Sequence, residues 1–183
     1  MRASHPDADG PEFWLRGPVP SIPPLLQPAA HALLQAQADL ARAARGLDAA
    51  DLWARPGGVA PIGFHLRHTA GSIGRLLTYA AGENLTPEQM AALRDEESPG
   101  NPPEAAVALL AGVDRAVSRA LGILRVTPEA TLALPRAVGR AQLPSTVAGL
   151  LFHLAEHAQR HAGQALTTRK WIAGSARDAS ISA

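Results

Sequence analysis

Three histidines near the C-terminal end have the spacing of metal ligands on a helix. His153, His157 and His161 follow one another at intervals of four within LFHLAEHAQRHAGQ, residues 151–164. Residues four apart lie one above the other on a helix face, so two such imidazoles can reach one metal ion. At about 100° per residue, His157 and His161 fall on or beside the apolar stripe and His153 at its edge. Because burying an imidazole without partners is costly, we expect a partner for the two inward histidines.

A second source of ligands lies earlier in the chain. His65 and His68 belong to a segment whose apolar residues recur with helical spacing. Helical phase places His65 closer than His68 to the apolar face. Three neutral imidazoles with open solvent positions suit zinc or nickel, and iron and manganese are alternatives. The chain has no cysteine, so any metal ion must be held by nitrogen and oxygen.

The last helix also contains the pattern H-x-x-E-H, which is found in inverted zinc proteases. Here it would consist of His153, Glu156 and His157. Such a site needs a further carboxylate ligand downstream, and Asp178 is the only acidic residue after His157. Helical phase also turns Glu156 away from the inward face. We therefore set the metalloprotease interpretation aside.

The segments that must position these histidines are helical. Helical periodicity and capping signals predict four main helices, over about residues 24–47, 61–81, 101–124 and 144–174. A capping box at Thr86–Gln89 predicts a short helix over residues 87–96 in the connection between the second and third. In the last connection, residues 131–134 are expected to be extended, and no alternation is long enough for a sheet. We predict an all-α fold, a four-helix bundle with long crossover connections.

Length and charge set the outer limits of this prediction. The 183 residues are expected to form one domain over residues 21–174, with an irregular lead-in over 1–20 and a tail over 175–183. The net charge of +1 gives no electrostatic indication of binding to nucleic acid or to a membrane surface. The N-terminus lacks the apolar run of a signal peptide, and no stretch approaches the roughly 20 apolar residues of a membrane span. We expect a soluble cytoplasmic protein.

Three stretches carry motifs of a known family. They are IGFHLRHTA at residues 62–70, LLTYA at 76–80, and HAQRHAGQ at 157–164, an H-x-x-x-H motif followed by Gly-Gln. They resemble the DinB-like family of small four-helix bundles over about residues 21–173. The resemblance implies three metal ligands, at His68, His157 and His161, whereas helical phase alone prefers His65 to His68. The family often has arginine directly after the last histidine, where this chain has Ala162.

The same resemblance suggests a function. The family includes thiol-dependent S-transferases, which implies a metal-dependent enzyme that transfers a low-molecular-weight thiol to an electrophilic small molecule. Neither the second nor the last helix offers an inward carboxylate as general base, which favours thiol activation over a metal-dependent hydrolase. A non-catalytic metal-binding module of a stress response is the alternative outside catalysis, and a homodimer is compatible with the resemblance. Candidates for further contacts around the site are His153, Gln164, Tyr79, Ser72 and Arg75.

Overall fold

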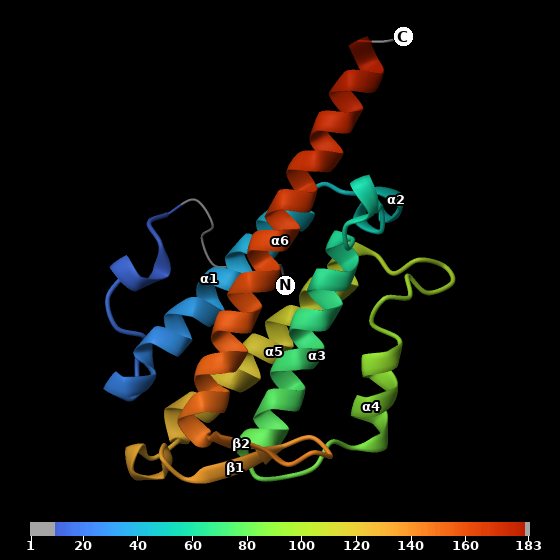
Figure 1. Ribbon diagram of the computed structural model, residues 1–183. Helices are drawn as coiled ribbons and strands as arrows, with labels where there is room; N and C mark the ends of the chain where they lie inside the picture. The colour runs from blue at the N-terminus through green and yellow to red at the C-terminus, as the bar shows by residue number, and fades with distance from the viewer. Residues whose placement is uncertain (1–9, 182–183) are drawn as a thin grey trace.

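The computed structural model describes the backbone of residues 10–181 and the side chains of residues 10–174. Most of this chain is helical, as predicted (Figure 1). The four long helices are α1 (Gln27–Ala44), α3 (Ile62–Ala80), α5 (Ala106–Val126) and α6 (Val147–Ile181). Residues 1–9 of the predicted lead-in and residues 182–183 of the predicted tail lie outside the described residues. Among the described residues, no helix combines the length and the hydropathy that crossing a bilayer requires.

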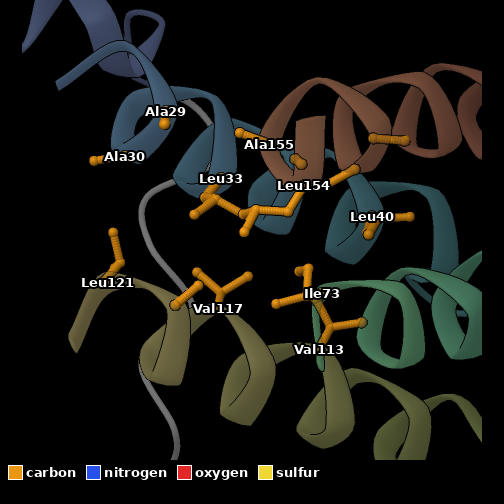
Figure 2. Close-up of a cluster of buried hydrophobic side chains, with 14 of the residues drawn as sticks. Ala29, Ala30, Leu33, Leu40, Ile73, Val113, Val117, Leu121, Leu154 and Ala155 are labelled. Atoms are coloured by element: carbon orange, nitrogen blue, oxygen red, sulfur yellow. The ribbon is translucent and has the colours of Figure 1, made fainter. Parts of the chain in front are cut away.

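One hydrophobic core joins the four long helices (Figure 2). Leu33 and Leu40 of α1, Ile73 of α3, Val113 of α5 and Leu154 of α6 are each 0% exposed. Burying a side chain of this kind contributes about 1.5–3 kcal/mol. The cluster holds the helices together with apolar side chains alone, so we expect the fold to persist when a histidine is replaced.

Alanines let α1 and α6 approach each other closely, and these two helices share the most extensive contact in the structure. Ala36 and Ala43 of α1 and Ala155, Ala158 and Ala162 of α6 are all almost completely buried. The small side chains leave little space between the two backbones. This contact fixes the position of α6, the helix that carries most of the candidate ligands.

Short elements fill the connections between the long helices. The link from α1 to α3 contains α2 (Ala49–Leu52) and a 3-10 turn at Pro56–Gly58, and the next link contains α4 (Pro87–Arg94). The predicted capping box is present, because Thr86 Oγ1 accepts from Gln89 N at 3.2 Å and Gln89 Oε1 accepts from Thr86 N at 3.0 Å. All of α4 is described, and none of its residues is buried. A further 3-10 turn at Phe13–Leu15 lies in the lead-in, and Phe13 is buried against the body of the protein.

The last connection differs from the prediction. β1 (Pro135–Val138) pairs antiparallel with β2 (Leu143–Thr146), with Pro135 opposite Thr146 and Val138 opposite Leu143. The expected extended piece at residues 131–134 is wrong in position, since a 3-10 turn occupies Glu129–Thr131 and the strand starts at Pro135. The expectation of no sheet is also wrong. Strands of four residues are too short to give a clear alternating pattern.

The last helix is longer than predicted. α6 continues to Ile181, so the predicted end near Gly174 is wrong. A single glycine inside a helix costs only about 0.5–1 kcal/mol, and no proline follows Gly174 to stop the helix.

Candidate metal centre

The candidate centre lies between α3 and α6, which run side by side (Figure 1). His68 comes from α3, and His157 and His161 come from successive turns of α6. One ring nitrogen of each residue lies within 4.8 Å of those of the other two. His68 Nε2 and His157 Nε2 are 2.9 Å apart. In a tetrahedral zinc site with Zn–N bonds of 2.0–2.1 Å, ligand nitrogens are about 3.3 Å apart, so this group could hold a metal ion after small side-chain shifts.

A buried carboxylate orients His68. Glu96, just after α4, is 4% exposed, and its Oε2 lies 2.6 Å from His68 Nδ1. An ionised carboxylate can only accept, so His68 donates from Nδ1, and in the neutral form of the ring this leaves a lone pair on Nε2. That lone pair faces His157. A carboxylate bonded to the far nitrogen of a ligating histidine is a common arrangement in metal sites.

Arg75 of α3 completes this network. Its Nη1 donates to Glu96 Oε1 at 2.6 Å, and both residues are buried. Gly71 makes room for the pair, because a Cβ there would lie 2.5 Å from Glu96 Oε1 and 2.7 Å from Arg75 Nη1. Both carboxylate oxygens of Glu96 are therefore engaged. Phe64 also stacks on the His68 ring, with the ring centroids 5.2 Å apart.

His65 contacts the cluster from behind. It is 4% exposed, and its Nδ1 lies 3.0 Å from Nδ1 of His161. One of these two nitrogens must donate and the other accept. If His161 donates, its Nε2 carries a lone pair, as a metal ligand requires. The geometry thus places His68 in the cluster of three and His65 next to it, as a hydrogen-bond partner of His161.

The surroundings keep these rings neutral. Burial is the main cause that lowers the pKa of His161 to about 3, and the neighbouring histidines and Arg160 lower it further. Burial, with the charge of His68, lowers the pKa of His65 to about 4. The pKa of His157 is also lowered, mainly by burial. Metal ligands must be unprotonated, so these shifts prepare the site for binding near neutral pH.

The comparisons agree with the motifs. The sequence model of the DinB superfamily matches residues 32–165, most of the chain and all three histidines of the cluster. The chain belongs to the DinB superfamily. Among solved structures, it is similar to a conserved protein from Enterococcus faecalis, with a TM-score of 0.64, 16% identity, and coverage of 81% of this chain and 96% of that one. At this identity the likeness shows the fold alone. The comparison with curated proteins gave no match.

This DinB superfamily member departs from the family pattern at Ala162. The residue is 0% exposed and belongs to the hydrophobic core. An arginine side chain would not fit there. The nearest arginine, Arg160, instead pairs with Glu156 at 3.0 Å.

The remaining residues singled out in the sequence have different positions. Arg75 belongs to the Glu96 network, whereas Ser72 donates to the Thr69 carbonyl at 3.1 Å and Tyr79 packs beside the core. His153 is exposed, and its Nδ1 lies 2.6 Å from Glu156. Because Glu156 pairs with His153 and Arg160 instead of joining the cluster, the structure gives no support to the protease pattern.

Two observations went beyond sequence reasoning. The sequence places Glu96 at the end of the short helix predicted over residues 87–96, and nothing in its neighbours along the chain indicates the buried contacts with His68 and Arg75. In addition, His157 Nδ1 is buried and has no hydrogen-bond partner among the described residues. A buried polar atom without a partner is rare in folded proteins. The ring nitrogen of His157 that faces His68 is Nε2, so Nδ1 does not itself mark the position of a metal ion.

Proposed function

We propose that this DinB superfamily member is a divalent-metal-binding four-helix bundle, with His68, His157 and His161 as ligands. The observation that carries the proposal is the convergence of three imidazoles from two helices, one of them oriented by a buried carboxylate. Zinc or nickel suits such a nitrogen set best, and iron and manganese are alternatives. With three protein ligands, the ion would keep at least one position for a small molecule.

We further propose that the protein is a metal-dependent enzyme that transfers a low-molecular-weight thiol to an electrophilic small molecule. A divalent ion with an open position lowers the pKa of a bound thiol or water. In the transfer, the thiol sulfur forms a bond to an electrophilic carbon, the thiol proton goes to solvent, and the leaving group departs with the electrons of the broken bond. Because the chain has no cysteine, the thiol must be a cosubstrate. The proposal includes a cytoplasmic location and a homodimer.

The chain's own residues favour this reaction over hydrolysis. A hydrolase benefits from a general base that accepts a proton from the attacking water. Glu96 is the carboxylate next to the cluster, but one oxygen faces His68 and the other accepts from Arg75. It is therefore suited to positioning His68 and not to accepting a further proton. A thiol that is activated by the ion alone needs no such base.

The first test is elemental analysis of the purified protein before and after chelation, with far-UV circular dichroism on both samples. We expect about one zinc or nickel ion per chain, removable without loss of helix because the apolar core is separate from the site. His161→Ala and His68→Ala should abolish stoichiometric binding and retain the helical spectrum. His65→Ala should keep the ion and weaken its affinity.

Unchanged metal content in both His161→Ala and His68→Ala would overturn the ligand assignment. No metal in the purified protein and no uptake of added zinc or nickel would overturn the metal site itself. If the metal-loaded protein catalysed no reaction in a screen of thiols against electrophiles, while metal binding followed the predicted pattern, the non-catalytic alternative would stand.

A further inference from the structure

A groove next to the candidate metal centre has the size of a small-molecule site. Its volume is about 410 Å³, and it runs between the stretch before α3 and one face of α6. Val59 and Ala60 form one wall, and Gly163, Thr167 and Trp171 form the other. Binding sites for small molecules have volumes of roughly 300–1,000 Å³.

Two residues connect this groove to the cluster of histidines. His65 lines the groove, and its Nδ1 lies 3.0 Å from Nδ1 of His161. Arg160 also lines the groove, and on α6 it comes three positions after His157 and directly before His161. A molecule in the groove would therefore lie against two side chains that adjoin the candidate ligands.

The walls indicate what kind of molecule fits. Trp171 supplies an indole ring to the groove. This ring packs closely on Gly57, because an added Cβ at Gly57 would lie only 3.1 Å from Trp171 Cζ3. Val59 adds an exposed apolar surface. Aromatic and aliphatic walls favour a molecule with an apolar or planar body.

The lining of the groove also includes a positively charged side chain, Arg160. Glu156 engages Nη2 of Arg160, but a guanidinium has five N–H donors in a planar fork that matches a carboxylate. Gln164 adds an amide to the lining. Because Glu156 engages Nη2 in both of its hydrogen bonds with Arg160, the donors on Nε and Nη1 of Arg160 suit a carboxylate on the ligand.

We propose that the groove binds the electrophilic substrate, and that this substrate is an organic acid with an apolar or aromatic body whose carboxylate pairs with Arg160. That the acid is a substrate rests on the proposed function, whereas binding of the acid in the groove does not. The pairing places the body of the acid along Trp171 and beside His65. The acid then lies against His65, which contacts His161 of the cluster.

Filling the groove tests the proposal. A Cβ at Gly163 would have no described heavy atom within 4 Å, so Gly163→Leu extends into the groove without displacing the fold. Gly174→Leu is the matched control, because Gly174 is also exposed on α6, has equally open space at its Cβ, and does not line the groove.

The probes are 3-phenylpropionate and its neutral analogue 3-phenylpropanol, titrated by calorimetry into the chelated protein and into the zinc-loaded protein. We expect the acid to bind both forms about tenfold more tightly than the alcohol, as a charged hydrogen bond contributes. Gly163→Leu should lower the affinity for the acid at least tenfold, and Gly174→Leu should leave it unchanged. Arg160→Gln should remove the preference for the acid.

Three results would overturn the proposal: no binding of the acid by the unmodified protein, equal affinity in Gly163→Leu, or an alcohol that binds as tightly as the acid. Because binding is also measured without metal, a failure of the metal site leaves this test intact. Loss of metal binding with the acid still bound would refute the proposed function alone.

Discussion

Replacing Glu96 by glutamine should weaken metal binding although Glu96 is not itself a candidate ligand. The carboxylate accepts a hydrogen bond from His68 Nδ1 at 2.6 Å and another from Arg75 Nη1 at 2.6 Å. In Glu96→Gln, the amide oxygen can still accept from Arg75, but the amide nitrogen then faces His68 Nδ1 as a donor. This contact favours the tautomer with hydrogen on Nε2, the nitrogen that faces His157.

Two magnitudes follow from this geometry. Loss of a hydrogen-bond partner behind a ligating histidine lowers metal affinity about 10–100-fold. The metal-free protein should also lose stability, since Arg75 and Glu96 are both buried and the guanidinium would lose its counter-charge. Breaking a buried ion pair costs about 3–5 kcal/mol, and the retained hydrogen bond to glutamine puts the expected loss near the lower end.

Chelator competition measures the affinity, and urea unfolding of the chelated protein measures the stability. Glu97→Gln is the matched control, because the neighbouring glutamate is 73% exposed and makes only a 3.3 Å pair with Arg55. This control should change the free energy of unfolding by less than about 1 kcal/mol and leave metal affinity unchanged. If Glu96→Gln bound metal as tightly as the unmodified protein, the proposed role of the carboxylate in orienting His68 would be refuted.

Two further predictions concern the same region. Gly74→Ala should raise the free energy of unfolding by about 0.5–1 kcal/mol, since its Cβ meets no described atom within 4 Å, whereas Gly71→Ala should lower it by about 1–3 kcal/mol by displacing Glu96. Urea unfolding checks both, and equal effects would contradict the close packing. The chelated protein should lose stability as the pH falls from about 6.5 to 5. Burial lowers the pKa of His65 to about 4 and of His161 to about 3, so only the unfolded chain takes up these protons. A urea midpoint that stayed constant over this range would refute the shifts.

The helices could be predicted from the sequence because their information is local. Spacings of three and four between alanine and leucine residues marked α1, and the capping box at Thr86 marked the start of α4. The i, i+4 pair His157 and His161 was equally visible, because both residues lie on one helix. The hairpin of β1 and β2 was not predicted, because its strands are only four residues long.

The rest of the site depends on tertiary contacts that no local pattern encodes. Glu96 reaches His68 from 28 positions away, out of a polar connection in which a glutamate resembles any surface residue. Helical phase correctly indicated that His65 is well buried, at 4% exposure. Burial alone does not single out the histidine that joins the cluster of three, because the cluster forms at the margin of the core, where the His68 side chain is 18% exposed.

The weak attachment of α4 has a consequence for how fast a metal ion could leave. All eight residues of α4 are described and none is buried, yet the chain that follows it inserts Glu96 behind His68. Segments with few buried contacts open locally at a low free-energy cost while the core stays folded. An opening of α4 that extends through the Arg75–Glu96 pair would withdraw Glu96 and release His68 for a moment. The lifetime of the bound ion would then depend on the opening rate of a peripheral segment, and amide hydrogen exchange in α4 would slow when the ion is present.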